Sequence, residues 1–163
     1  GDFEFLIVDD GSRDGSPAII RHYAASDSRV RPVIRENRGL IASLNEMLAL
    51  ARAPLIARMD ADDISEPHRF GQQIGFLRAN PDYGVVGSWS REIDVSGQPV
   101  TVKGGDHPLT HEDMLAAIAS GGQLICHPSV MFRREVVAGV GGYHAAFRHC
   151  EDLDLWLRLA SVT

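Results

Sequence analysis

The first half of the chain alternates short apolar segments with amphipathic stretches, and this order constrains the fold more than any other feature. Apolar segments occur at residues 5–8, 30–34 and 54–57. Each precedes a stretch with helical spacing of its apolar residues, as in Leu40, Leu44 and Leu48. An alternation of strand and helix repeated three times is typical of an α/β fold with a mainly parallel sheet.

Two helix starts are indicated by their local sequence. Ser16 stands directly before Pro17, which predicts a side-chain cap followed by proline at the first helical position. Thr110 and Asp113 have the spacing of a capping box, in which each side chain accepts a hydrogen bond from the other residue's main chain. This second helix is expected to run through residue 119.

The second half of the chain is less regular. Residues 83–94 and 98–103 are expected to form a hairpin, and residues 129–132 a strand. Residues 151–160 predict a further helix. Its expected buried face consists of Leu153, Trp156, Leu157 and Ala160.

Composition excludes several classes of protein. The 163 residues suit one domain, and the net charge of −6 argues against nucleic-acid binding, which requires a basic face. Cys126 and Cys150 lie outside any CxxC pattern, so we expect free thiols rather than a zinc site or a disulfide framework. No apolar run approaches the roughly 18 residues of a membrane span, so no transmembrane segment is expected in this chain.

Carboxylates follow two of the predicted strands directly. Asp9 and Asp10 end the first, and Asp60, Asp62 and Asp63 follow the third. If these strands are parallel neighbours, the acids meet at one edge of the sheet, where α/β proteins bind ligands. A group of acids is costly unless a cation neutralises it, and Mg²⁺ or Mn²⁺ prefers such oxygen ligands.

Simpler roles compete with this interpretation for some of the acids. Asp-Gly and Asp-Ser sequences are common in turns, so turn capping is the favoured role of Asp9 taken alone. Asp63 could be an ordinary cap near a helix start. No turn requires a run of three acids in four positions, so a metal or ligand role is favoured for Asp60 and Asp62.

Five segments in this order resemble the nucleotide-sugar half of a family 2 glycosyltransferase. They are LIVDDGSRDGS, ENRGLIASLNEMLALA, ARMDADDISEPHRF, HPSVMFRREVV and HCEDLDLWLRLA. The resemblance implies a GT-A fold, a three-layer α/β sandwich with a mainly parallel mixed sheet that lacks its first strand–helix unit. It also implies one catalytic domain fragment, with a nucleotide-sugar-binding half at 1–80 and an acceptor-side half at 81–163.

The same resemblance implies roles for residues of the nucleotide-sugar half. Asp10 matches the acid that accepts a hydrogen bond from uracil N3–H, which cytosine lacks. Arg38 matches the arginine beside the base or diphosphate, although a solvated surface arginine is the alternative. Asp60 and Asp62 match the DxD element, which holds Mn²⁺ or Mg²⁺ and thereby the two phosphates.

Residues near the end of the chain match the acceptor side of the family. Asp152 matches the general base of an inverting, single-displacement reaction, and Glu151 precedes it. Acids placed for the helix dipole are the alternative for this pair. His127 lies in a segment similar to the acceptor-side wall, and a structural histidine with satisfied hydrogen bonds is its alternative.

The resemblance implies a donor, an acceptor and a location for the whole protein. The expected donor is a UDP-sugar and the expected acceptor is a glycan or a lipid-linked glycan of the cell surface. The expected location is the cytoplasmic side, with possible attachment to the inner face of the membrane. The chain is expected to be truncated at both ends, to have weak or absent activity, and to form a homodimer through an exposed sheet edge.

Two other functions fit part of the pattern. A nucleotidyltransferase also places carboxylates and Mg²⁺ at the edge of an α/β sheet, but it normally carries a basic glycine-rich phosphate loop near its start. The corresponding segment here, DDGSRDGS, is acidic. A non-catalytic nucleotide-binding module is the third candidate, and the presence of both Asp62 and Asp152 argues against it.

Overall fold

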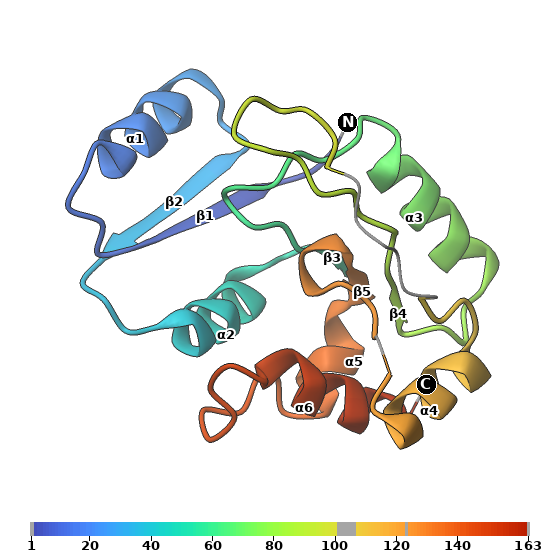
Figure 1. Cartoon of the computed structure of the whole chain (residues 1–163). Coiled ribbons are helices and arrows are strands. Elements are labelled where there is room, and N and C mark those ends of the chain that lie inside the picture. The colour runs from blue at the N-terminus through green and yellow to red at the C-terminus, as the bar shows by residue number, and fades with distance from the viewer. Residues whose placement is uncertain (1, 101–106, 123, 163) are drawn as a thin grey trace.

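The computed structural model describes residues 2–100, 107–122 and 124–162, and its first half alternates strands and helices as predicted (Figure 1). The order is β1 (Phe5–Asp10), α1 (Ser16–Ser26), β2 (Val30–Arg35), α2 (Leu40–Leu50), β3 (Leu55–Ala57) and α3 (Arg69–Ala79). The second half follows with β4 (Val85–Val86), α4 (His111–Ser120), the 3-10 helix η1 (His127–Ser129), β5 (Met131–Arg133), α5 (Arg134–Gly139) and α6 (Glu151–Leu159).

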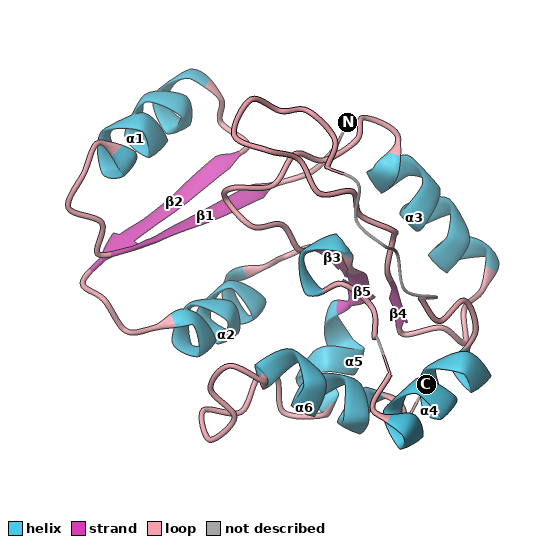
Figure 2. Ribbon diagram, viewed as in Figure 1, coloured by secondary structure: helices cyan, strands magenta, loops and turns pink. Residues whose placement is uncertain are grey.

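The described strands form two sheets (Figure 2). β1 and β2 pair in parallel, with Asp10 opposite Arg35 at their carboxyl ends. β5 lies between β3 and β4 and is antiparallel to both. The acid-ended strands β1 and β3 are therefore not neighbours within the described residues, so their acids do not meet through strand pairing.

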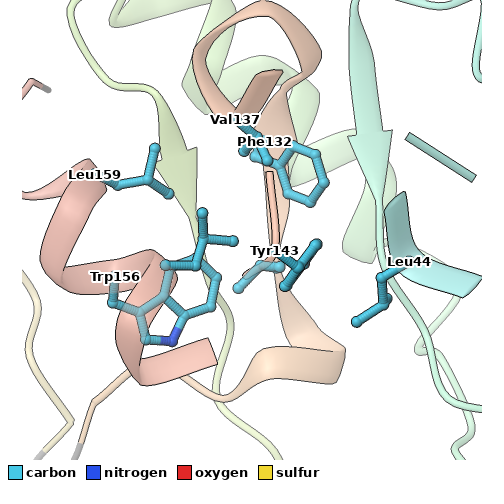
Figure 3. Packing of buried hydrophobic residues seen from close by; sticks show 8 residues of the cluster. Leu44, Phe132, Val137, Tyr143, Trp156 and Leu159 are labelled. Atoms are coloured by element: carbon cyan, nitrogen blue, oxygen red, sulfur yellow. The ribbon is translucent and has the colours of Figure 1, made fainter. Parts of the chain in front are cut away.

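The main core lies where the second sheet meets α2, α5 and α6 (Figure 3). Its buried residues are Leu44, Val130, Phe132, Val137, Tyr143, Leu155, Trp156 and Leu159. Leu44 comes from α2 and most of the others from β5, α5 and α6, so segments from both halves of the chain share one core. β1 is only half-buried, and Phe5 at its start is exposed.

Some local predictions are confirmed and others are wrong. The capping box of Thr110 and Asp113 is present at the start of α4. Ser16 does not cap α1, because Gly15 occupies the cap position and Ser16 is already helical. Its main-chain N–H instead donates to Asp14 at 2.9 Å, so the turn residue before it satisfies that donor.

The buried face of α6 differs in part from the predicted one, which correctly included Trp156. Leu155, Trp156 and Leu159 are buried, whereas Leu153 and Leu157 are exposed. Both sets have helical spacing, and the contact of α6 with α5 decides which set faces inward.

The described part of the predicted hairpin is present, since main-chain hydrogen bonds join Val100 to Glu92 and Asp94 to Gln98 across the turn. Ile93 and Pro99 form an isolated antiparallel bridge around a turn held by the carboxylate of Asp94. The outer part of its second arm, residues 101–103, lies outside the described residues.

In the ranges described above, the helices are too short or too polar to cross a bilayer.

Candidate functional site

A tight turn follows β1 and is held by the first of its two acids. Asp9 is buried, and its Oδ1 accepts hydrogen bonds from the main-chain N–H groups of Gly11 at 3.2 Å and Ser12 at 3.0 Å. The turn-capping role predicted for Asp9 is confirmed. Gly11 has φ +88°, and a Cβ there would lie 2.8 Å from the main-chain nitrogen of Asn37, so this turn packs closely against the loop after β2.

Asp10 holds that second loop in place. Its Oδ1 accepts from the main-chain N–H of Arg38 at 2.9 Å and its Oδ2 from that of Gly39 at 2.8 Å. It also forms an ion pair with Arg35. Burial opposes ionisation of Asp10, but the hydrogen bonds from Arg38, Gly39 and Arg35 outweigh it and lower the pKa of this carboxyl. Asp10 therefore stays ionised and organises the loop.

Arg35 connects this loop to α2. Its guanidinium contacts the carboxylate of Glu46 at 2.7 Å and the hydroxyl of Ser43 at 2.9 Å in addition to Asp10. Arg38, by contrast, is 60% exposed and lies 3.9 Å from Glu46. The side chain of Arg38 therefore remains available to a ligand.

A polar cavity of about 510 Å³ opens at the carboxyl ends of β1 and β2. It is lined by Gly11, Ser12, Arg13, Arg35, Glu36 and Asn37. The cavity thus lies directly beside the loop that Asp10 holds, at the end of a parallel strand pair where α/β proteins bind ligands.

The three acids after β3 form a cluster. Carboxylate oxygens of Asp60, Asp62 and Asp63 lie within 4.8 Å of one another. Asp62 and Asp63 are exposed and Asp60 is partly buried. A turn closed by the Asp63 N–H and the Asp60 carbonyl oxygen, 3.3 Å apart, brings them together. Several carboxylates on a short loop match the ligand chemistry of Mg²⁺ or Mn²⁺, so the residues present fit a hard divalent cation.

Arg58 stands directly before this cluster and pairs with its first acid. The guanidinium contacts Oδ1 of Asp60 at 2.6 Å and Oδ2 at 3.1 Å. The Arg58 side chain is only 9% exposed, and its Nε has no hydrogen-bond partner among the described residues. The main chain of Arg58 is fixed by Val130 and by Arg69, which donates to its carbonyl oxygen at 2.8 Å. A buried, fixed cation thus compensates part of the charge of the cluster.

His127 interacts electrostatically with Arg58, the partner of Asp60, and with Asp152 in the first turn of α6. The ring is buried, and Nε2 is 2.9 Å from the hydroxyl of Tyr143. The pKa of His127 is lowered to about 4, mainly by burial and to a smaller extent by the charge of Arg58, whereas the charge of Asp152 opposes the shift. His127 is therefore neutral at physiological pH and close to two charges of opposite sign.

The first turn of α6 carries the predicted acceptor-side acids. Glu151 is buried, and Asp152 is partly exposed with its Oδ1 2.8 Å from the main-chain nitrogen of Leu153. The charges of Asp152 and Glu151 also act on Tyr143, whose pKa is raised mainly by burial. The structure therefore brings Arg58, His127, Tyr143 and the α6 acids together, and Arg58 links this group to Asp60.

The loop held by Asp10 remains a separate part of the site. Within residues 2–100, 107–122 and 124–162, no hydrogen bond or ion pair joins Asp10 or Arg38 to Asp60 or Asp62. A second cavity of about 510 Å³, between β4, α4 and α6, is lined by none of the predicted site residues. Its walls are mainly apolar and include Trp89 and Trp156.

The model of the family described as "Glycosyl transferase family 2" matches residues 1–141. That range contains the loop of Asp10, the acid cluster and His127.

The chain belongs to Glycosyl transferase family 2.

Two bacterial relatives of this family 2 chain match almost all of its length. EpsE of Bacillus subtilis (strain 168) is 36% identical over 161 residues, which cover 96% of this chain and 55% of the relative. The O-antigen biosynthesis glycosyltransferase WbnJ of Escherichia coli is 32% identical over 159 residues, covering 97% of this chain and 60% of the relative. The chain thus spans between half and two thirds of the length of these relatives.

A solved structure confirms the predicted GT-A fold. The mannosyltransferase PcManGT of Pyrobaculum calidifontis, solved in complex with GDP-Man and Mn²⁺, superimposes with a TM-score of 0.60. The match covers 86% of this chain and 38% of that one, at 21% identity. At this identity the likeness establishes the fold of the family 2 chain and leaves its ligands to be tested.

Sequence reasoning missed several residues of the site. Arg58 is adjacent to the DxD element, so its position could have drawn attention, but its pairing with Asp60 depends on side-chain conformation. No local sequence pattern marks Tyr143 as a site residue, because His127, the residue that it contacts, lies 16 positions away in the sequence. Asp63, which belonged to the predicted acid run with an ordinary cap as its alternative, lies in the acid cluster. Cys126 and Cys150 are free, as predicted.

Proposed function

We propose that this family 2 chain carries the donor site and the general base of a metal-dependent inverting glycosyltransferase that uses a nucleotide-diphosphate sugar. The observation that carries the proposal is the cluster of Asp60, Asp62 and Asp63, whose oxygens lie within 4.8 Å of one another. Family membership and the O-antigen biosynthesis named for WbnJ support it.

Asp60 and Asp62 are the proposed metal ligands, and the position of Asp63 makes it a third candidate. A bound Mn²⁺ or Mg²⁺ would neutralise the diphosphate and stabilise the charge that develops on it as it leaves. Arg58, already paired with Asp60, adds a second positive charge at the same place.

Asp10 and Arg38 are the proposed contacts to the nucleotide. The carboxylate of Asp10 already accepts from Arg38, Gly39 and Arg35, and an ionised carboxylate has about four acceptor positions, so one remains for the N–H of a ring nitrogen in the Watson–Crick edge of a base. Uracil and guanine each present such a donor, whereas cytosine does not. We favour a UDP-sugar as the donor, and comparison with GDP tests the choice.

Asp152 is the proposed general base, with Glu151 and His127 on the acceptor side. In one displacement, the acceptor oxygen forms a bond to the anomeric carbon while the bond from that carbon to the phosphate oxygen breaks, which inverts the configuration. The acceptor proton passes to Asp152 and the bond electrons leave with the nucleoside diphosphate.

The acceptor, location and assembly of the whole protein are further parts of the proposal. We propose a glycan or lipid-linked acceptor for cell-surface polysaccharide, used on the cytoplasmic side where nucleotide sugars are made. Within the described ranges β1 pairs only with β2 and β3 only with β5. The second edges of β1 and β3 are candidates for pairing in a homodimer, which light scattering at several concentrations would test.

Calorimetric titration of the chain with UDP, with and without Mn²⁺, tests the proposed function. We expect binding that requires Mn²⁺ and is lost in Asp62→Ala, since Asp62 is exposed and its truncation leaves the core intact. Asp82→Asn, an exposed acid outside the cluster, is the matched control and should bind normally. Preference for UTP would favour a nucleotidyltransferase, and absence of binding to any nucleotide would refute the donor site.

A further inference from the structure

A chain of hydrogen bonds runs from α2 to His127 through Tyr143. Asn45 in α2 donates from Nδ2 to the carbonyl oxygen of Tyr143 at 2.7 Å, and its Oδ1 accepts from the Tyr143 N–H at 2.8 Å. The amide of Asn45 thus fixes both polar groups of the Tyr143 main chain. The Tyr143 hydroxyl in turn lies 2.9 Å from Nε2 of His127, so α2 positions a residue that contacts the predicted acceptor side.

The loop that carries Tyr143 is also held from α6. Arg158 donates to the carbonyl oxygens of Val140 at 2.6 Å and Gly142 at 2.7 Å, while it pairs with Asp154 at 2.6 Å. In the view of Figure 3, Tyr143 lies between Trp156 of α6 and Leu44 of α2, which belong to the same core. Tyr143 is 4% exposed. Its hydroxyl is therefore held in place before any ligand binds.

The hydrogen of the buried Tyr143 hydroxyl needs a hydrogen-bond acceptor, and this need determines the direction in which the hydroxyl donates. The described residues offer the Tyr143 hydroxyl no hydrogen-bond acceptor other than Nε2 of His127. If Nε2 carried the histidine proton, that proton would point at the hydroxyl oxygen and the hydroxyl hydrogen would be buried without an acceptor. Such a buried, unsatisfied donor costs about 1–3 kcal/mol. Donation from Tyr143 to Nε2 avoids this cost.

A neutral histidine whose Nε2 accepts a hydrogen bond carries its proton on Nδ1. Nδ1 of His127 has no hydrogen-bond partner within the described residues. The fully buried atoms that lack a partner belong to Arg58, Arg134 and Trp156, so Nδ1 of His127 retains some access to solvent. An accessible N–H group therefore faces away from the Tyr143 hydroxyl.

We propose that Tyr143 is a positioning residue that fixes the tautomer of His127, so that His127 presents Nδ1–H to an oxygen of the diphosphate. The identity of that oxygen rests on the proposed function, whereas the tautomer does not. Arg58 lies close enough to His127 to influence its ionisation and holds Asp60 of the acid cluster. The ring thus stands at the acceptor side, next to the place where the metal would hold the phosphates.

Because the His127 ring is neutral, its Nδ1–H remains a hydrogen-bond donor whose charge does not change across the physiological pH range. Burial keeps His127 uncharged above about pH 4, so the N–H donor persists through the physiological range. A protonated ring would instead add a charge that varies with pH beside Asp152. A neutral donor can orient an oxygen without lowering the basicity of the neighbouring carboxylate.

Long-range ¹H–¹⁵N correlation spectra of the uniformly labelled chain test the tautomer directly at pH 7. We expect a pyrrole-like Nδ1 and a pyridine-like Nε2 for His127, with the signal assigned from its loss in His127→Asn. In Tyr143→Phe the population should move toward Nε2–H. A proton on Nε2 in the wild type, or an unchanged spectrum in Tyr143→Phe, would overturn the proposal. If Tyr143→Phe does not fold, the wild-type spectrum alone decides.

A titration with UDP and Mn²⁺ tests the donor role of Nδ1. The amide nitrogen of asparagine lies as far along the side chain as Nδ1, and that of glutamine lies nearer to Nε2. We therefore expect His127→Asn to bind within about threefold of the wild type, and His127→Gln and His127→Ala about tenfold more weakly, as for a lost hydrogen bond to a charged group. The reverse order of the asparagine and glutamine variants would overturn the donor role. Absence of UDP binding by the wild type would refute the proposed function, and the spectra would still decide the tautomer.

Discussion

The guanidinium of Arg58 donates hydrogen bonds to both carboxylate oxygens of Asp60, at 2.6 and 3.1 Å, and Asp60 forms a cluster with Asp62 and Asp63. Arg58 is thus the ion-pair partner of the first acid of the cluster, while Asp63 interacts electrostatically with Arg69. The Arg58 side chain is 9% exposed and that of Asp60 is 42% exposed, so water screens the pairing from the side of Asp60. A divalent ion that binds the cluster must share Asp60 with Arg58.

Replacement of Arg58 by methionine is expected to tighten binding of Mn²⁺. The change removes a positive charge next to the cluster, and a charge of this kind at an intermediate effective dielectric contributes on the order of 1–2 kcal/mol, or about tenfold in affinity. Electron paramagnetic resonance of free Mn²⁺ measures the affinity. Arg78→Met, an exposed arginine on α3, is the matched control. Weaker binding in Arg58→Met would show that Arg58 orients Asp60 more than it competes for it.

Replacement of Asp10 by asparagine is expected to loosen the loop after β2. Asparagine offers one oxygen where Asp10 uses two to accept from Arg38 and Gly39, and it cannot form the ion pair with Arg35. We expect a loss of about 2 kcal/mol in the free energy of unfolding and faster amide exchange at Arg38 and Gly39. Unchanged exchange at these two amides would contradict the role of Asp10 in organising the loop.

Gly142→Ala is expected to disrupt the contact between Asn45 and Tyr143. Gly142 has φ +67°, and a Cβ there would lie 2.6 Å from Oδ1 of Asn45. The left-handed conformation alone costs about 1–2 kcal/mol for a residue with a side chain, so a loss of about 3 kcal/mol in the free energy of unfolding is expected with the clash.

Gly75→Ala is the matched control for this substitution. Gly75 lies within α3, and a Cβ there would meet no atom within 4 Å. The alanine should stabilise the protein by about 0.5–1 kcal/mol, because glycine is a poor helix former. Equal effects of the two substitutions in urea denaturation would show that the contact with Asn45 does not matter.

Stability should fall as the pH decreases from about 6.5 to 4, because of His127. Its pKa is lowered from 6.5 to about 4 in the folded state, so the unfolded chain takes up a proton in this window and the folded chain does not. The loss amounts to about 3 kcal/mol when complete. Asp10 and other acids with lowered pKa values lose most of their contribution at lower pH, as the pH falls through the unfolded value, 3.8 for Asp10, toward the lower folded value.

Urea denaturation at pH 7 and at pH 4.5 measures this dependence. His127→Gln, which cannot be protonated, should lose much less stability between the two pH values than the wild type. His22→Gln is the matched control, since His22 is exposed on α1. The interpretation fails if the wild type and His127→Gln show the same difference.

The local sequence determined much of what lies within single elements. Strand–helix alternation, the capping box of Thr110 and Asp113, the turn role of Asp9 and the acid run after β3 were all predicted, because each depends on residues a few positions apart. The five ordered segments also pointed to the family that the comparison confirmed.

Tertiary structure alone decided how these elements meet. The choice between two apolar faces of α6 depends on what packs against it, so Leu155 and Leu159 are buried and Leu153 and Leu157 are not. Strand partners follow from the whole sheet, and β3 joins β5, more than 70 positions away. The pairing of Arg58 with Asp60 depends on side-chain rotamers, and the contact of Tyr143 with His127 depends on how a loop packs against the 3-10 helix η1. Burial and side-chain geometry, which arise only in the folded chain, turn these residues into a site.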